Sequence, residues 1–443
     1  MISKQNILLF LGLLLSSLSL KADVFRILDD EEDALQCRID LIERAQKEIL
    51  LSYYILNDDL VGMTIFSALI DAAQNRGVKV CMFVDAVNSK ISNPVMRYLE
   101  EQGIEVRIFK PGKIYKPFSY ARRMHNKLFI TDDINIIVGG RNIKKEYYSL
   151  GKDFNFMDRD VFVNSKSAGE TARKHFYSIW DNRKIAFNRE LPAINDEMRE
   201  EIQRKMRLAK NLMMQLSLIK FHAPKDWTEG QKQTDHTPVF EHDNFYISRK
   251  GKRLEVDYKD KGSTKALLKI INHAQHSIYM ENAYVIPTTK WRKALKKAIK
   301  RGVKIRIMTN SPQTSDVMLA EAAYRNARHK LVKMGIEMWE YQGPKTIHTK
   351  STVIDDSISI VSSYNLVSLS ENWSTEVAVW VADTTLAKQH EAIMERNLER
   401  AIQIDKHNDP IWREIPDSKP LTCKKKVQLN LWRYSFAWVM RAL

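Results

Sequence analysis

Two distant segments of the chain carry the same four residue types at the same spacing. In each segment a lysine follows a histidine by two residues, an aspartate by seven and an asparagine by seventeen. At an ordinary abundance of ~5% per residue type, such a match arises by chance roughly once in a hundred thousand starting points. Two matches therefore indicate one active site built from two related halves. The first set is His125, Lys127, Asp132 and Asn142, and the second is His348, Lys350, Asp355 and Asn365.

The histidines, lysines and asparagines together suit the chemistry of a phosphate diester. Lysine ammonium groups and amide donors stabilise charge on the non-bridging oxygens of a phosphate. Imidazole has an unperturbed pKa near ~6.5, so one neutral and one protonated histidine can coexist near neutral pH. One of them can attack phosphorus while the other acts as the acid. This scheme requires neither a metal ion nor an organic cofactor.

Each set is predicted to lie in a β-hairpin. Residues 125–131 alternate in polarity, the pair Asp132-Asp133 forms the turn, and residues 134–138 form the return strand. On a strand, a histidine and the lysine two residues later share one face. Asp132 and Asp355 instead lie at the turns and are expected to brace local structure without touching substrate.

Each catalytic histidine also needs an acceptor that holds its tautomer. Asp160 lies eighteen residues after Asn142, and Glu376 lies eleven residues after Asn365. We predict that these two acids support the histidines, while an ordinary solvated carboxylate is the alternative for each.

Landmarks upstream of the two sets recur in the same order. Residues 45–49, 73–80 and 103–105 match residues 274–278, 298–305 and 335–337, at offsets of 229, 225 and 232, and the histidines are 223 apart. This pattern predicts an α/β fold with an internal duplication of units about two hundred residues long. The expected divisions are 23–195 for the first lobe, 196–242 for a connecting helix (196–220) and loop (223–242), and 243–443 for the second lobe.

The composition permits two packed units and favours an anionic partner. The chain has 443 residues, 44% of them hydrophobic, and 70 Lys and Arg against 54 Asp and Glu, for a net charge of +16. Such a charge suits phospholipid surfaces or nucleic acids and does not choose between them. The three cysteines, Cys37, Cys81 and Cys423, have no metal-ligand spacing, and no disulfide framework is expected.

The two ends of the chain suggest contact with a membrane. Residues 1–22 place Lys4 ahead of an apolar run and resemble a bacterial signal peptide, cleaved after Ser19 or Ala22, or a retained anchor. Export to the cell envelope, or secretion, is the corresponding expectation. Residues 424–443 mix lysines with aromatic residues, and they either seat on an anionic membrane surface or close the second lobe.

The two sets resemble the paired motifs of the phospholipase D superfamily, over a span from about Val24 to about Glu414. The resemblance is strongest to its cardiolipin synthase C branch. It implies two α/β/α lobes packed around one shared active site, a phosphohistidine intermediate and no metal. The segments that carry the branch resemblance are 123–127, 139–143, 146–148, 309–311 with Asp316, and 324–325.

By this resemblance His125 attacks phosphorus and His348 protonates the departing alcohol, although the order of the histidines could be reversed. A phospholipid or glycerol acceptor makes the reaction a phosphatidyl transfer, and water makes it hydrolysis. Lys144, Lys145, Ser362 and the segment 312–314 depart from the family pattern and put the choice of acceptor in doubt.

Two rival functions differ from a phospholipid phosphatidyltransferase or phospholipase. One is a nuclease of the same superfamily, for which the +16 charge would bind a phosphate backbone. No aromatic platform interleaved with basic residues supports that reading. The other is a silent membrane-binding scaffold, which the intact His, Lys and Asn residues disfavour. The expected partner is therefore a phospholipid surface, with nucleic acid second and no obligate protein partner.

Overall fold

The computed structural model describes the chain except for residues 1–22, 110–121, 184, 251–252, 419 and 436–443. The predicted signal segment and the end of the basic aromatic C-terminal segment lie outside the described residues. Among the residues that are described, no helix is both long and apolar enough to cross a membrane.

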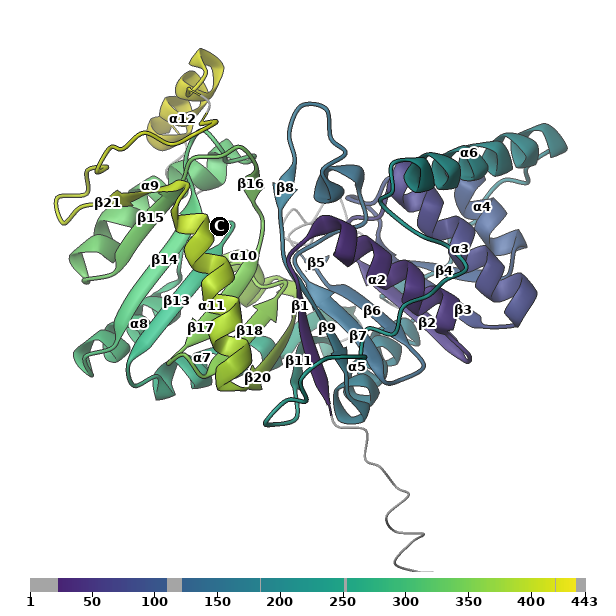
Figure 1. The fold of residues 1–443 in the computed structure, drawn as a ribbon, viewed down its shortest axis with the longest axis horizontal. Helices are drawn as coiled ribbons and strands as arrows, with labels where there is room; N and C mark the ends of the chain where they lie inside the picture. Colours follow the sequence, from purple (N-terminus) through teal and green to yellow (C-terminus); the bar gives the residue numbers. More distant parts are fainter. Residues whose placement is uncertain (1–22, 110–121, 184, 251–252, 419, 436–443) are drawn as a thin grey trace, which may run out of the picture.

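The first lobe is a mixed sheet with helices on both faces (Figure 1). Helices α2 (Glu31–Arg44), α3 (Leu60–Arg76) and α4 (Asn93–Glu101) pack their apolar residues on one face, and α5 (Lys166–Trp180) covers the other. In spatial order the strands are β1 (Val24–Leu28), β9 (Asp160–Asn164), β7 (Asn135–Gly139), β6 (Lys127–Thr131), β2 (Glu48–Tyr53), β3 (Lys79–Asp85), β4 (Ile104–Phe109) and β10 (Ala186–Phe187).

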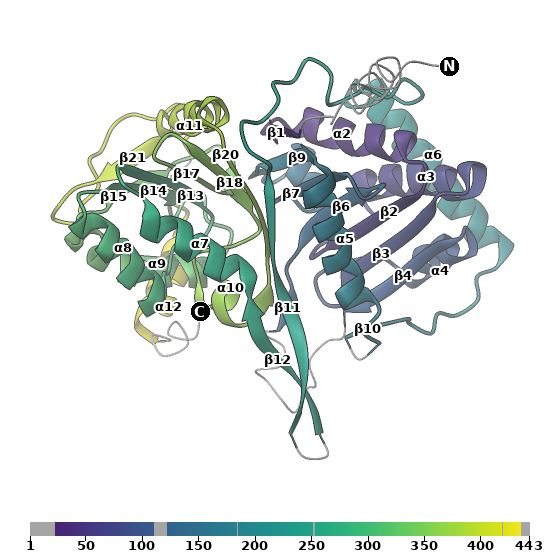
Figure 2. The ribbon, with the colours of Figure 1, turned by 90° about the horizontal axis from the view of Figure 1, so that it is seen from below.

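The second lobe repeats this plan. Helices α7 (Gly262–His273), α8 (Thr289–Lys300) and α9 (Met318–Lys333) cover one face of its sheet, and α11 (Thr384–Leu398) covers the other. Two of its strands, β11 (Val239–Lys250) and β12 (Arg253–Lys261), form a hairpin that extends away from the lobes (Figure 2). The strands in order are β12 (Arg253–Lys261), β11 (Val239–Lys250), β20 (Val377–Ala382), β18 (Ile358–Ser362), β17 (Lys350–Ile354), β13 (Ser277–Asn282), β14 (Lys304–Asn310), β15 (Glu337–Tyr341) and β21 (Ala401–Ile404).

The duplicated helix-to-strand landmarks form the same local structure twice. Helix α3 ends before Gly77, which has a φ of 66°, and parallel strand β3 follows. Helix α8 ends before Gly302, which has a φ of 93°, and parallel strand β14 follows. A left-handed residue stops a helix without penalty only when it lacks a Cβ. The predicted fold of two related α/β lobes is confirmed.

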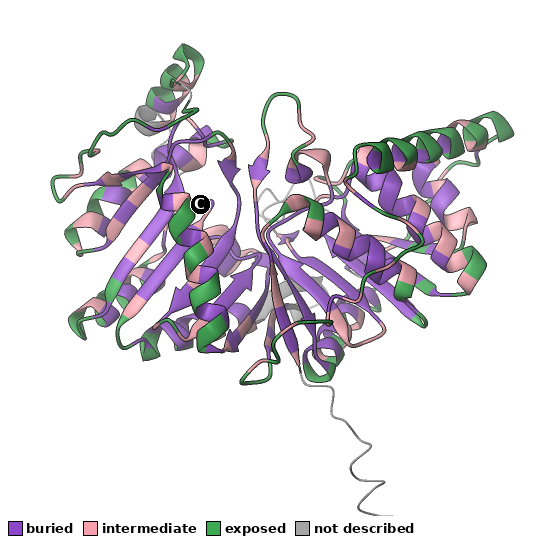
Figure 3. Cartoon of the chain, viewed as in Figure 1, coloured by how far each residue is buried: buried purple, intermediate pink, exposed green. Residues whose placement is uncertain are grey.

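The lobes join through a shared apolar core and two short strand pairs. Val161, Val163 and Phe176 of the first lobe belong to one buried cluster with Val361 and Val379 of the second. Buried residues accordingly continue across the seam, while the outer faces of α6 (Asp196–Gln215) and α11 are exposed (Figure 3). The strand pairs, both parallel, are β5 (Arg123–Met124) with β19 (Ser374–Thr375), and β16 (Thr346–Ile347) with β8 (Phe156–Met157).

Three local expectations differ from the structure. The strand predicted from residue 125 begins at Lys127, because His125 follows the separate strand β5. The connecting helix predicted for 196–220 is α6, which ends at Gln215 and packs on α3 at the outside of the first lobe. The predicted loop 223–242 ends early, because β11 begins at Val239 and forms a hairpin with β12 that local sequence patterns did not indicate.

The C-terminal segment folds back on the second lobe as helix α12 (Cys423–Ser435), which packs against α9. Leu429 is buried there beside Ala322 and Ala323. Of the two alternatives for this segment, the described part agrees with an element that packs on the second lobe and closes it. Cys37 and Cys81 are buried free thiols, and Cys423 is an exposed one.

Candidate active site

Each motif histidine is fixed by a strand of the opposite lobe. His125 directly follows β5, and its backbone N–H donates to the carbonyl of Thr375 at 3.2 Å. His348 directly follows β16, and its N–H donates to the carbonyl of Met157 at 2.7 Å. The two inter-lobe strand pairs therefore bring both histidines to the seam.

The residue after each partner strand supplies a carboxylate to the histidine. Nδ1 of His125 lies 2.9 Å from Oε2 of Glu376, and Nδ1 of His348 lies 2.6 Å from Oδ2 of Asp158. Both carboxylates are fully buried, and an ionised carboxylate only accepts hydrogen bonds. Nδ1 of each ring must then carry the hydrogen, which leaves Nε2 as the reactive nitrogen. The lobes thus exchange acids, and neither histidine is oriented by its own half.

Asp160 does not support a histidine as the sequence had suggested. Its carboxylate pairs with Arg38 at 2.8 Å and accepts from the backbone N–H of Arg141 at 3.2 Å. The strand registers explain the error: Asp160 lies opposite Gly139, and Ala378 lies opposite the equivalent Ser362. The counterpart of Glu376 is therefore the residue two positions before Asp160, which is Asp158. Aligning the two copies along these strands would have found it.

The small residues before the first asparagine make room for these acids. A Cβ at Gly140 would collide with Oδ1 of Asp158, and one at Gly139 would collide with Oδ1 of Asp160. Their small size therefore leaves space for the two buried carboxylates.

The two lysines lie beside the histidines and have weakened basicity. Nζ of Lys127 donates to the carbonyl of His125 at 2.9 Å, and Nζ of Lys350 donates to that of His348. Burial, followed by the charge of Lys350, holds the pKa of Lys127 well below its usual range. Burial lowers the pKa of Lys350 to about 8. Nζ of Lys350 is also 2.8 Å from Nδ1 of His348, but that nitrogen donates to Asp158 and cannot accept a second hydrogen.

The charges of both halves act on one another across the seam. Burial lowers the pKa of His348 well below its ordinary value, and the positive charges of Lys350, Lys127 and His125 lower it further. Burial also lowers the pKa of His125, although the Glu376 carboxylate opposes that shift. The structure therefore gathers the four basic side chains into one site, where the lowered pKa values of both imidazoles favour their neutral forms.

The two asparagines have different surroundings. Asn142 accepts from the N–H of Ile55 at 3.1 Å and donates to the hydroxyl of Tyr147 at 2.7 Å. Asn365 is buried, and its carboxamide oxygen has no partner among the described residues. An amide binds phosphate oxygens through its N–H groups, and Nδ2 of Asn142 donates to Tyr147, whereas no hydrogen bond from Nδ2 of Asn365 is found among the described residues. Asn365 therefore has the freer donor of the two.

Tyr147 lies in the segment 146–148 that carries the branch resemblance, but the sequence pattern gave it no role at the site. Its hydroxyl lies 3.5 Å from Nε2 of His348, and its ring stacks on Phe156 at 4.4 Å. It lies in a short 3-10 helix, residues Lys145–Tyr148, five positions after Asn142. The equivalent position in the second half is Ser370, whose hydroxyl accepts from the backbone N–H of Asn365. The two halves therefore differ at this point.

The motif aspartates lie at the hairpin turns. Asp132 accepts from the backbone N–H groups of Gln46, Lys47 and Glu48, at 2.8 to 3.1 Å. Asp355 accepts from three consecutive N–H groups, those of residues 275–277, at 2.7 to 2.9 Å. Both aspartates thus anchor the hairpin to the start of the neighbouring strand, away from the histidines.

Asp158 and Asp160 form a matched pair for mutation. Asp158→Asn is expected to lower kcat by ~10²- to 10⁴-fold, because an amide at Nδ1 no longer enforces the required tautomer. Asp160→Asn is expected mainly to destabilise the fold, by about 3–5 kcal/mol, because it leaves the buried Arg38 unpaired. Steady-state kinetics and denaturant unfolding of both variants separate the two effects, and equal losses of kcat would contradict the assignment.

Comparisons with known proteins agree with this geometry. Two related lobes whose seam holds two histidine–carboxylate pairs and two lysines define an enzyme of the phospholipase D superfamily. Residues 39–180 and 267–398, one segment from each lobe, match the family described as cardiolipin synthase, PLD-like domain. The chain belongs to this family.

Individual relatives cover most of the chain. Cardiolipin synthase C of Escherichia coli is 27% identical over 458 residues, which span 92% of each chain. An uncharacterized protein of Helicobacter pylori is 30% identical over 400 residues, 82% of this chain and 77% of that one. The crystal structure of phosphatidylserine synthase from Haemophilus influenzae superposes with a TM-score of 0.65 at 12% identity, covering 94% of this chain and 95% of that chain, and supports the fold alone.

No group of three or more His, Cys, Asp or Glu side chains suited to a metal ion occurs among the described residues. The histidine nitrogens that face the acids are occupied by those hydrogen bonds.

Proposed function

We propose that the protein transfers a phosphatidyl group from a phospholipid to an alcohol through a phosphohistidine formed on His125. The pair of histidine–carboxylate contacts exchanged between the lobes carries this proposal. It supplies two oriented imidazoles next to two cationic lysines, which is the set that a two-step displacement at a phosphate diester requires. Membership of the cardiolipin synthase family supports phospholipid as the substrate class.

The difference between the two Nε2 atoms supports His125 as the nucleophile. Nε2 of His348 has the hydroxyl of Tyr147 beside it, whereas Nε2 of His125 has no hydrogen-bond partner within the described part of the chain. Burial keeps His125 neutral because it lowers the pKa, and the neutral imidazole is the nucleophilic form.

The reaction then takes two steps. Nε2 of His125 forms a bond to phosphorus as the bond to the first alcohol breaks, and Nε2 of His348 gives that alcohol a proton. The anionic diester offsets the lysine charges that lower the pKa of His348, so substrate binding favours its protonated form. In the second step, His348 takes a proton from the incoming alcohol, whose oxygen replaces His125 on phosphorus. Lys127, Lys350 and Asn365 hold the non-bridging oxygens throughout.

The test is turnover by protein lacking residues 1–22, with EDTA present, on phosphatidylglycerol vesicles, phosphatidylethanolamine vesicles and DNA. Cardiolipin from phosphatidylglycerol is the expected product. If phosphatidic acid is the only lipid product, the reaction is hydrolysis and not transfer. DNA cleavage without lipid turnover would instead favour the nuclease, and dependence on added metal would contradict the metal-free mechanism.

Binding of a phosphate diester should weaken as pH rises through about 8. Lys350, whose pKa burial lowers to about 8, is charged below that pH and loses its ammonium charge above it. Dimethyl phosphate stays a monoanion over this range, so its Kd, measured by competition, reports the protein's titration. Lys350→Gln should bind it weakly at all pH values without this transition. An unchanged transition in that variant would assign it to another group.

Association with an anionic phospholipid surface is part of the same proposal, and the +16 charge supports it. Export to the cell envelope stays a prediction from residues 1–22.

A further inference from the structure

A carboxylate and a phenol of the second lobe form a pair beside the catalytic segment. The hydroxyl of Tyr284 donates to Oδ1 of Asp316 at 2.8 Å. The side chain of Asp316 is exposed, and among the described residues it forms no salt bridge. Its second carboxylate oxygen therefore remains available to a ligand.

The segment that carries Asp316 is bonded directly to the segment that carries His348. The Asn310 carboxamide donates to the carbonyl of Ile347 and accepts from its N–H, each at 2.8 Å. The hydroxyl of Thr346 donates to the carbonyl of Thr314 at 2.6 Å. The turn before Asp316 is thus hydrogen-bonded to Thr346 and Ile347, the two residues that directly precede His348.

Tyr284 is tied to the other catalytic residue of this lobe. It follows β13 by two residues, and the last residue of that strand, Asn282, lies opposite Lys350 in the sheet. The side chain of Asn282 also accepts from the N–H of Tyr284 at 3.3 Å. Although Asp316 is exposed, surrounding protein raises the pKa of its carboxyl by desolvation, and the charge of Lys350 opposes that rise. The carboxylate is reachable from solvent and close enough to Lys350 to sense its charge.

The C-terminal helix holds the turn in place. Nζ of Lys425 in α12 donates to the carbonyls of Gln313 and Ser315, at 2.7 and 2.9 Å. Figure 1 shows α12 at one end of the second lobe, next to α9, where Leu429 anchors it. A turn fixed from both sides presents Asp316 in one orientation, which lowers the entropic cost of binding a ligand.

The chemistry of a carboxylate restricts what it can bind at this place. It repels a phosphate, so it gives the anionic diester no stabilisation. The ammonium groups of Lys127 and Lys350 would repel a cationic ligand bound at this place. A neutral hydroxyl can donate to the free oxygen of Asp316 without either penalty.

We propose that Asp316 and Tyr284 form the subsite for the acceptor alcohol and bind a hydroxyl of a glycerol group. This inference rests on the proposed phosphatidyl transfer. One glycerol hydroxyl donates to Asp316, while its neighbour gives a proton to Nε2 of His348 and attacks phosphorus. The new oxygen–phosphorus bond forms as the bond from phosphorus to His125 breaks. The glycerol group can belong to free glycerol or to the headgroup of a second phosphatidylglycerol.

The test compares acceptors on phosphatidylglycerol vesicles. Labelled glycerol, 1-propanol and the lipid headgroup itself are the acceptors, and phosphatidic acid reports hydrolysis. In Asp316→Ala, transfer to glycerol should fall at least tenfold more than hydrolysis, mainly through a higher KM for glycerol, while the preference for glycerol over 1-propanol disappears. Asp316→Asn keeps an acceptor oxygen and should retain part of that preference. Tyr284→Phe should weaken it less than Asp316→Ala does.

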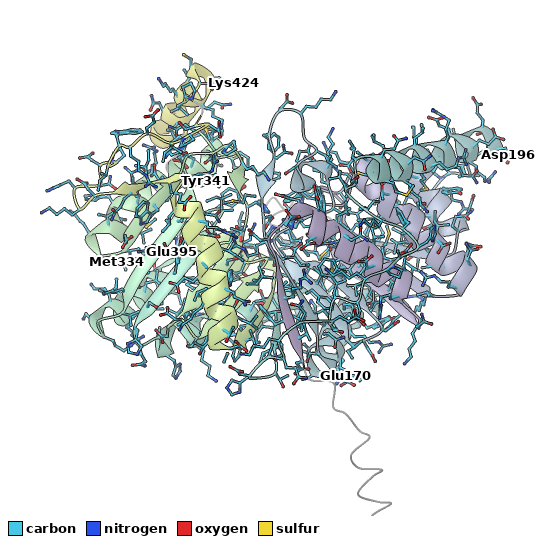
Figure 4. All side chains as sticks on the ribbon, in the orientation of Figure 1. Glu170, Asp196, Met334, Tyr341, Glu395 and Lys424 are labelled. Carbon is cyan, nitrogen blue, oxygen red and sulfur yellow. The ribbon has the colours of Figure 1, made fainter. Side chains whose placement is uncertain are left out.

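The control is Asp196→Asn, which removes an exposed carboxylate at the outer end of α6, far from the seam (Figure 4). It should behave as wild type. If Asp316→Ala loses both cardiolipin formation and transfer to glycerol, the subsite binds both the lipid headgroup and free glycerol. If it loses only one of these activities, the subsite binds only the corresponding acceptor. An equal fall of transfer and hydrolysis in Asp316→Ala would overturn the subsite. So would a loss confined to phosphatidylethanolamine turnover, which would indicate an ammonium ligand. If wild type forms no transfer product at all, the proposed function itself fails.

Discussion

Replacing either His125 or His348 by alanine is expected to lower kcat for lipid turnover by ~10⁴-fold or more. Groups that act as one catalytic unit each cost about as much as the whole unit when removed. A loss of ~10⁴-fold corresponds to about 5.5 kcal/mol of transition-state stabilisation. His273→Ala, at the exposed end of α7, is the matched control and should keep full activity. Substantial turnover by either active-site variant would contradict a shared site.

A labelled phosphatidyl group distinguishes the roles of the two histidines. With a leaving group that needs no proton, such as p-nitrophenol, His348→Ala should still form a phosphohistidine and then accumulate it, because no base activates the acceptor. His125→Ala should form none. Peptide mapping of the acid-labile label identifies the modified residue, and label on His348 would reverse the assigned order.

The fold was predictable because the chain contains its own comparison. A single His-x-Lys match carries little information, but two copies with matching upstream landmarks define two related α/β units. What local periodicity could not show is contact between segments far apart in the chain. The alternating pattern predicts a strand from His125, but the strand β6 starts at Lys127. His125 instead follows β5, which forms only by pairing with β19, about 250 residues downstream, and local sequence does not reveal such a contact.

The same limit explains the misassigned acid. Asp158 and Asp160 are two residues apart, and spacing alone does not choose between them. The choice depends on which of them lies opposite Gly139 and which reaches the other lobe. Glu376 was easier to find because it lies between the strands β19 and β20, and neither strand contains an acid.

The differences between the halves are where a duplicated sequence is least informative. The repeat predicts equal roles for Asn142 and Asn365, yet only Asn142 is followed at the fifth position by a tyrosine that reaches the opposite histidine. Tyr147 and the pair Asp316 and Tyr284 have no equivalent in the motif. Such residues give the two halves different roles, as nucleophile and acid or as donor and acceptor site. A repeated motif cannot indicate them, so they are identified only from contacts in the structure.

Breaking the buried ion pair between Arg159 and Glu281 should destabilise the fold strongly. Nη1 of Arg159, on the first lobe, is 2.7 Å from Oε2 of Glu281 on the second, and both side chains are fully buried. Nη2 of Arg159 also pairs with Asp29 at 2.8 Å, and Asn397 donates to Oε1 of Glu281. Arg159→Met leaves a buried carboxylate without its cation and should cost about 3–5 kcal/mol in free energy of unfolding.

Glu395→Gln is the surface control, because it removes a comparable pair between Arg306 and Glu395 on the exposed face of α11 (Figure 4). Its effect should be under ~1 kcal/mol. The double variant Arg159→Met/Glu281→Met removes both charges and should recover part of the loss, since apolar replacement of a whole buried pair is often neutral or stabilising. Denaturant unfolding measures all three, and a double variant less stable than Arg159→Met would contradict the argument.

Arg159 should also link stability to catalysis, because it lies between Asp158, which orients His348, and Asp160, which pairs with Arg38. Arg159→Met is therefore expected to lower kcat even at temperatures where the protein stays folded. Recovery of stability in the double variant without recovery of kcat would show that the arginine also fixes the position of Asp158. Because Asp158 crosses the seam to reach His348, the contacts that hold the two lobes together are the same ones that align the reacting groups.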